Sequence, residues 1–171
     1  MNSHTTTKDT HGRAWVFGDN IDTDLLAPGA YMRAPLQVVA EHCMEAVSEK
    51  FASEVEQGDF MVGGDNFGLG SSRELAVQAL AFLGIKAIVA KSFARIFYRN
   101  SINLGLPVLA CPDIDAIADG DRISVDIGTG IVSNHTSGKS IQCEPIPPFL
   151  VTLIEEGGLL PSLKNRLGVG K

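Results

Sequence analysis

Hydrophobic positions divide this chain into short apolar runs separated by segments rich in glycine, proline and aspartate. The apolar run Phe60–Val62 and the mostly apolar segment Ile85–Ala90, which contains Lys86, flank the stretch Glu74–Leu83, and this order predicts a strand–helix–strand unit. Strands joined in this way run parallel, with a right-handed crossover. A helix from Lys91 to about Asn103 and a buried strand at Leu106–Ala110 extend the same pattern.

The rest of the chain predicts a second β layer and outer helices, and hence an α/β fold. Gly18–Ala30 reads as an irregular loop, because it is rich in Asp, Gly and Pro. The other predicted elements are a strand at Trp15–Phe17, a helix at Leu36–Val47, a helical turn at Ile114–Ala118, alternating strands at Arg122–Ile127, Ile131–Asn134 and Lys139–Cys143, and a last helix at Phe149–Glu156.

The segment Gly63–Glu74, which reads GGDNFGLGSSRE, is the strongest candidate for a functional site. It follows a predicted strand and opens a predicted helix, with Ser71 or Ser72 as the expected helix cap. Glycines allow close backbone approach to a ligand, and helix N-termini attract anions. Arg73 adds a planar fork suited to a carboxylate. An anion site is therefore predicted here; the alternative is a glycine loop and a capped helix without chemistry.

Several classes of function are disfavoured by the same sequence. No lysine precedes the two serines, as a phosphate-binding P-loop requires, and Arg73 stands where a dinucleotide fingerprint needs its third glycine. A net charge of −6 disfavours a nucleic-acid partner, and no apolar run approaches the roughly 20 residues of a membrane span. The N-terminal segment is polar and lacks a signal-peptide core. We therefore expect a cytoplasmic protein with a loose tail at residues 1–12 and one domain over residues 13–171.

The cysteines and histidines offer no metal site. Cys43, Cys111 and Cys143 are far apart in the sequence and form no C-x-x-C pair, so we expect each to be a buried, small hydrophobic residue. None of the four histidines is spaced as one of a ligand pair. We expect this chain to bind no metal.

Two ordered motifs resemble the swivelling domain of the aconitase superfamily, a three-layer β/β/α fold. They are GDNFGLGSSRE and the stretch KSFARIFYRNSINLGLPVL at Lys91–Leu109. The length of the chain and the segment Gly18–Tyr31 (GDNIDTDLLAPGAY) resemble the separate small subunits of the isopropylmalate dehydratase family. The resemblance runs in order from about Ala14 to Leu109.

The resemblance assigns roles to six residues: Ser71 as catalytic base, and Ser72, Arg73, Arg33, Thr23 and Asp24 as substrate-binding residues. Alternatives remain for some of them. Ser72 could simply cap the helix, and Asp24 could simply form a turn. Arg33 lies in the loop that selects the substrate in this family, but Met32 and Ala34 depart from the family's pattern and leave the substrate open.

The resemblance also implies that this chain is half of a two-chain hydro-lyase. The 4Fe–4S cluster of such enzymes would then lie on a large partner subunit, in a heterodimer or heterotetramer, with a small dicarboxylate as substrate. The implied reaction interconverts 3-isopropylmalate and 2-isopropylmalate in leucine biosynthesis. The alternatives are a related dehydratase acting on 2,3-dimethylmalate, methylmalate or homoaconitate, or an anion-binding domain without catalysis.

Overall fold

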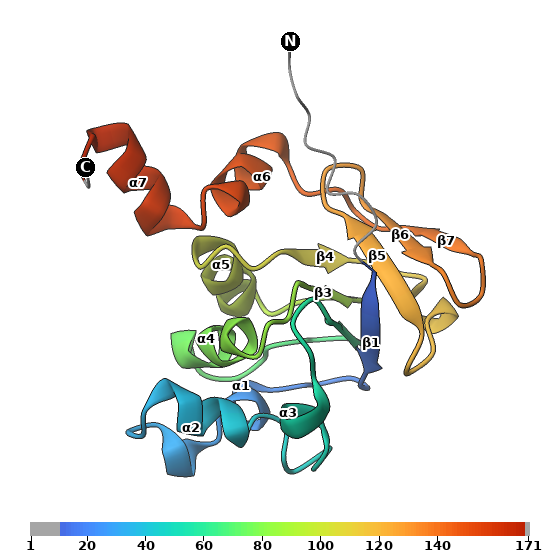
Figure 1. Cartoon of the computed structure of the whole chain (residues 1–171), viewed down its shortest axis with the longest axis horizontal. Coiled ribbons are helices and arrows are strands. Elements are labelled where there is room, and N and C mark those ends of the chain that lie inside the picture. The colour runs from blue at the N-terminus through green and yellow to red at the C-terminus, as the bar shows by residue number, and fades with distance from the viewer. Residues whose placement is uncertain (1–10, 170–171) are drawn as a thin grey trace.

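The computed structural model describes residues 11–169, which form one α/β domain (Figure 1). Its elements follow in chain order: β1 Gly12–Val16, α1 Thr23–Leu26, the 3₁₀ turn η1 Gly29–Tyr31, α2 Leu36–Glu41, α3 Phe51–Glu54, β2 Phe60–Gly63, α4 Glu74–Phe82, β3 Ala87–Ala90, α5 Arg95–Asn103, β4 Val108–Ala110, the 3₁₀ turn η2 Ile114–Ala116, β5 Arg122–Asp126, β6 Ile131–Asn134, β7 Ser140–Gln142, α6 Pro148–Glu155 and α7 Leu159–Leu167.

The strands form one seven-stranded sheet in the order β4-β3-β2-β1-β5-β6-β7. Strands β1 to β4 are parallel, with Ala14 opposite Phe60 between β1 and β2. Strands β5 to β7 are antiparallel, and β5 joins β1 through the pair Gly12 and Ile123. The strand β1 therefore belongs to both halves of the sheet.

The two halves of the sheet form separate layers (Figure 1). Helices α4 and α5 lie on one side of the parallel strands, and β5 to β7 lie on the other. All residues of β2 and β3 are buried, as in a parallel sheet covered on both faces. This arrangement confirms the expected three-layer β/β/α architecture.

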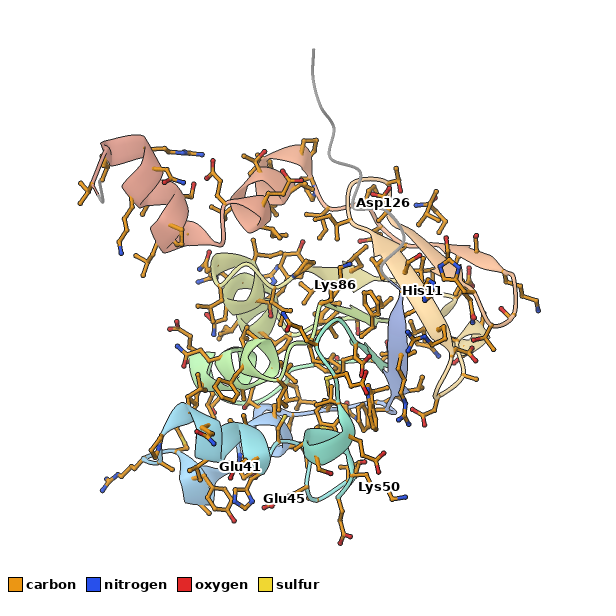
Figure 2. All side chains as sticks on the ribbon, in the orientation of Figure 1. His11, Glu41, Glu45, Lys50, Lys86 and Asp126 are labelled. Carbon is orange, nitrogen blue, oxygen red and sulfur yellow. The ribbon has the colours of Figure 1, made fainter. Side chains whose placement is uncertain are left out.

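Two predicted helices have different limits in the structure. The helix predicted at Leu36–Val47 ends at Glu41, because Met44 adopts a positive φ of 63° and donates its N–H to the Leu25 carbonyl at 2.8 Å. Glu45 beyond this reversal lies at the outer rim of the molecule, as Figure 2 shows. The helix predicted from Lys91 begins only at Arg95.

Two further segments, one near each end of the chain, contain helices that were not predicted. The loop predicted at Gly18–Ala30 contains the short helix α1, and α7 after Gly158 was not predicted. Residues 1–10 of the expected tail lie outside the described residues, whereas Gly12 already belongs to β1.

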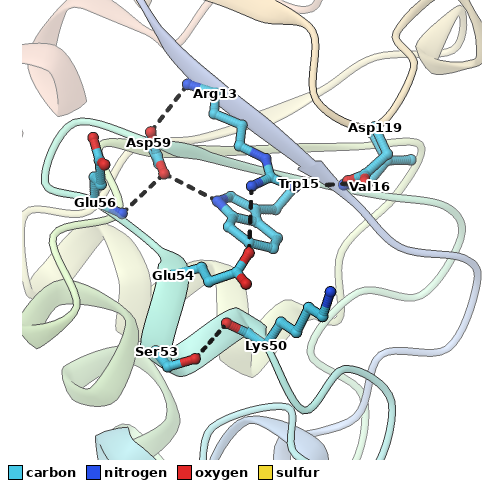
Figure 3. Close-up of polar contacts among 9 residues, drawn as sticks. All are labelled: Arg13, Trp15, Val16, Lys50, Ser53, Glu54, Glu56, Asp59 and Asp119. Carbon is cyan, nitrogen blue, oxygen red and sulfur yellow. Dashed lines mark hydrogen bonds and ion pairs between the residues drawn. The ribbon is translucent and has the colours of Figure 1, made fainter.

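The buried carboxylate of Asp59 joins β1 to the start of β2 (Figure 3). It accepts hydrogen bonds from the backbone N–H of Arg13 at 3.0 Å, the indole N–H of Trp15 at 3.0 Å and the backbone N–H of Glu56 at 2.9 Å. The guanidinium of Arg13 stacks over the Trp15 ring, 3.7 Å from its centroid. Three donors around one charged acceptor fix the first parallel strand pair, on which the candidate site is built.

Replacing Asp59 with Ala should lower the free energy of unfolding by about 2–4 kcal/mol, since the buried Trp15 N–H and two backbone N–H groups lose a charged acceptor. Urea denaturation of the purified chain measures this change. Asp119→Ala is the matched control: Asp119 is exposed, accepts one hydrogen bond, from the Val16 N–H at 2.9 Å, and lies 3.9 Å from the Arg13 guanidinium in an exposed ion pair, so its loss should cost about 1 kcal/mol or less. Equal losses in the two variants would contradict this role for Asp59.

Candidate functional site

The glycine-rich loop after β2 lies against the segment that follows β1. Backbone hydrogen bonds join Gly64 to Gly18 at 3.0 Å, Asn20 to Asp65 at 2.8 Å, Gly68 to Ile21 at 2.6 Å and Thr23 to Leu69 at 2.9 Å. Asp22 and Leu69 form an isolated parallel β-bridge within this series. The parallel pairing of β1 and β2 thus continues beyond the two strands and brings α1 beside the end of the loop.

The other side of the loop is attached to the segment after β3. Phe67 donates its N–H to the Ser92 carbonyl at 3.0 Å and accepts a bond from the Ala94 N–H at 3.0 Å. The Ser92 hydroxyl accepts from the Asn66 N–H at 2.9 Å and lies 3.2 Å from a carboxylate oxygen of Asp65. These contacts give Ser92 a structural role in holding the loop.

Two glycines allow the loop to pack closely against neighbouring side chains. Gly68 has a φ of 82°, and a Cβ there would overlap the ring of Phe97. A Cβ on Gly64 would overlap the carboxylate of Asp19, which accepts the Asp65 N–H at 2.7 Å. The glycines therefore serve close backbone packing, which fixes where the following serines lie.

The structure brings Ser71 next to Thr23, two of the predicted site residues that are far apart in sequence. Their hydroxyl oxygens are 3.5 Å apart, at the limit of a hydrogen bond. Thr23 is buried at the start of α1, whereas Ser71 is exposed. The Ser71 hydroxyl thus contacts buried Thr23 on one side and is accessible to an incoming molecule on the other.

The structure also pairs Arg73 with Asp24. One guanidinium nitrogen of Arg73, Nη1, donates to Oδ1 of Asp24 at 2.9 Å and to the Ala27 carbonyl at 3.0 Å. The same Asp24 oxygen accepts the Gly29 N–H at 3.0 Å. These two hydrogen bonds, first that of Arg73, lower the pKa of Asp24 below its ordinary value, so the carboxylate stays charged near neutral pH.

The prediction that Ser71 or Ser72 caps the following helix is wrong. The N-cap of α4 is Arg73, and no side chain makes a capping hydrogen bond there. Arg73 donates its N–H to the Ser71 carbonyl at 2.8 Å, which turns the chain sharply before the helix. Ser72 is exposed, and its side chain makes no hydrogen bond with the described residues. Both hydroxyls are therefore available for chemistry.

Arg33 is not bonded to the other predicted site residues. Its side chain is exposed just after η1, and no hydrogen bond or ion pair joins it to the other five within residues 11–169. The loop that carries it is nevertheless linked to the site, because Gly29 at the start of η1 donates to Asp24. The Ala27 carbonyl and the Gly29 N–H are partners that the sequence could not identify, since any residue supplies these backbone groups.

A cavity of about 320 Å³ opens at the carboxyl ends of β1 and β2. Its lining includes Lys91 and Asp19, but not Ser71, Ser72 or Arg73. Nζ of Lys91 is 3.2 Å from the carboxylate of Asp115, and this contact, more than any other, raises the pKa of Lys91. Because the ammonium group is already paired, we assign Lys91 a structural role and place the candidate site at the serines.

Within residues 11–169, no group of three or more His, Cys, Asp or Glu side chains is arranged to hold a metal ion. The three cysteines are free thiols and are buried, as the sequence predicted. Burial raises the pKa of the Cys43 and Cys143 thiols, which disfavours the thiolate that a metal requires. In the same part of the chain, no helix is long and apolar enough to cross a membrane.

Comparison with known proteins identifies the family. Residues 22–113 match the aconitase C-terminal domain. The 3-isopropylmalate dehydratase small subunit 1 of Thermotoga maritima is 49% identical over 156 residues, which are 90% of this chain and 94% of the relative. The methanogen homoaconitase small subunit of Methanothermobacter thermautotrophicus is 49% identical over 160 residues, 93% of each chain.

A solved structure agrees with these sequence relatives. The crystal structure of 3-isopropylmalate dehydratase (LeuD) from Methanocaldococcus jannaschii has a TM-score of 0.88 and 44% identity, and the match covers 93% of this chain and 95% of that one. The chain belongs to the aconitase C-terminal domain family, in the group of separate small subunits related to those of 3-isopropylmalate dehydratase and methanogen homoaconitase.

Proposed function

We propose that this chain is the small subunit of a two-chain hydro-lyase that interconverts 3-isopropylmalate and 2-isopropylmalate. The observation that carries the proposal is the joint position of Ser71 and Arg73 at the end of one glycine loop, each beside a residue of α1. The relatives named as dehydratase small subunits, similar over nearly their whole length, support the same reaction.

The chemistry requires a proton to leave a carbon next to a carboxylate while hydroxide leaves the neighbouring carbon. Ser71 is proposed as the base for the proton, with its hydroxyl oriented by Thr23. Arg73 would bind a substrate carboxylate: Nη1 is used by Asp24 and Ala27, whereas no partner within residues 11–169 is found for Nη2 and Nε. The N-terminus of α4 adds a favourable potential for the anion.

A serine hydroxyl is a weak base in water, and Ser71 is exposed in this chain. We therefore propose that a large subunit covers the site, excludes water and completes it. The 4Fe–4S cluster implied by the resemblance would also lie on that subunit, because the buried thiols of this chain do not suit cluster ligation. Covered in this way, donors near Ser71 would stabilise its alkoxide more strongly.

A second candidate substrate is a malate with a carboxylate-bearing side chain, as in homoaconitate. Arg33 favours it, since an exposed guanidinium in the proposed substrate loop could bind the extra carboxylate. A relative named as a homoaconitase small subunit is as similar as the isopropylmalate relatives. Arg33 could instead extend its aliphatic stem along an isopropyl group with its charge in solvent.

Reconstitution tests the proposed function. The chain should be inactive alone and should interconvert the two isopropylmalates when mixed with an iron-containing large subunit. The assay follows formation of the alkene intermediate by ultraviolet absorbance, with each subunit alone as control. Turnover by this chain alone after treatment with a chelator would contradict the two-chain proposal.

Ser71→Ala should reduce kcat of the reconstituted enzyme by about 10²–10⁴-fold, since the proposed base is removed. The exposed hydroxyl makes one weak contact, so the free energy of unfolding should change by no more than about 0.5 kcal/mol. Ser72→Ala is the matched control and should mainly raise KM. A large loss of kcat in Ser72→Ala with near-normal Ser71→Ala would reverse the two assignments.

Arg33→Val should change substrate preference more than overall activity. The ratio of kcat/KM for 3-isopropylmalate to kcat/KM for a carboxylate-bearing malate should rise about tenfold, or about 1.4 kcal/mol, because a guanidinium is replaced by an apolar side chain. Lys139→Val, an exposed cation between β6 and β7, serves as control. An unchanged ratio would show that Arg33 does not face the substrate.

A further inference from the structure

The helix α7 has an apolar stripe that its own domain does not cover. Leu160 and Leu167 are 68% and 73% exposed, and Leu159 and Leu163 are 38% and 41% exposed. At about 100° per residue, these four leucines fall within an arc of about 100°, the width of a typical buried helix face. Ser162, by contrast, is only 1% exposed, so the helix turns a polar residue toward its own domain.

We propose that the leucine stripe of α7 (Leu159, Leu160, Leu163 and Leu167) binds the same stripe of a second copy of this chain, with the two helices antiparallel. Contiguous apolar patches on soluble proteins mark interaction sites. A stripe centred near Leu163 is self-complementary in this orientation, because Leu163 then meets its own copy and Leu159 meets Leu167. A twofold symmetric pair requires such a surface.

The charges at the two ends of the helix favour this orientation. Glu155 and Glu156 precede α7, and Lys164 and Arg166 lie in its last turn. Antiparallel packing places the basic turn of each copy toward the acidic pair of the other, and it also opposes the helix dipoles favourably. A parallel pair would instead bring like charges together.

The position of the stripe separates it from the candidate site. Figure 1 shows α7 at the upper left and α1, which carries Thr23 and Asp24, lower in the view, with α5 and α4 between them. A large subunit that covers the serines need not cover α7, so both contacts can form at once. The proposal therefore does not depend on the proposed reaction and can fail independently of it.

Sedimentation equilibrium of the full chain over a concentration series tests the pairing. The wild type should form a dimer, and Leu163→Asp should raise its dissociation constant at least about 100-fold, since a charge would be buried at the centre. Phe82→Asp is the matched control, because Phe82 is an apolar residue 54% exposed at the end of α4. Circular dichroism verifies that the variants are folded.

Charge exchange distinguishes antiparallel pairing from other contacts. The variant with Glu155→Lys and Glu156→Lys, and the variant with Lys164→Glu and Arg166→Glu, should each dimerise at least about tenfold more weakly than wild type. Mixed together, one basic and one acidic α7 region should form a heterodimer of restored affinity.

Three results would overturn the proposal. They are a wild-type chain that stays monomeric at every concentration, a Leu163→Asp dimer as stable as wild type, and a mixture of the two charge variants that does not associate. Loss of binding to the large subunit in Leu163→Asp, with a monomeric wild type, would identify that subunit as the occupant instead.

Discussion

The candidate site depends on the continued pairing of the chain segments that follow β1 and β2. Backbone hydrogen bonds join the segment Gly18–Thr23 to the glycine loop, although neither segment is a regular strand there. This pairing continues that of β1 and β2, which the buried Asp59 carboxylate joins. The β1–β2 pair thus positions the glycine loop, and the loop positions the two serines.

The ion pair between Asp24 and Arg73 determines which nitrogens of Arg73 can bind a ligand. Asp24 uses a single oxygen to hold both Arg73 and the start of the loop that carries Arg33. Because its pKa is lowered, this pairing persists at neutral pH and weakens only as the pH falls through the lowered value. Arg73 is therefore anchored by one nitrogen, and the rest of its fork can face a ligand. The proposed substrate contacts require that one nitrogen of Arg73 binds Asp24 and the others bind the substrate.

The sequence predicted what is local or periodic. The β2–α4–β3 unit, the strands of the antiparallel layer and the buried cysteines follow from apolar patterning, and they agree with the structure. The bond between Arg73 and Asp24 joins residues 49 positions apart, and no local pattern reveals it. Family resemblance drew attention to both residues without describing their contact.

The errors have physical causes as well. A serine before a helix usually caps it, but here the turn from Ser71 to Arg73 replaces the cap. The helix after Pro35 stops early because Met44 reverses the chain and is buried. The sequence did not predict helix α7, because Gly157 and Gly158 are typical of the end of a helix, here the one predicted at Phe149–Glu156, although Gly158 in fact precedes a new helix.

The most direct test of this account is a crystal structure of the chain assembled with its large subunit and a malate-type inhibitor. The account predicts an inhibitor carboxylate on the free nitrogens of Arg73, with the Ser71 hydroxyl facing the carbon that loses its proton and the Arg73–Asp24 bond intact. An inhibitor bound in the cavity beside Lys91, away from both serines, would contradict it.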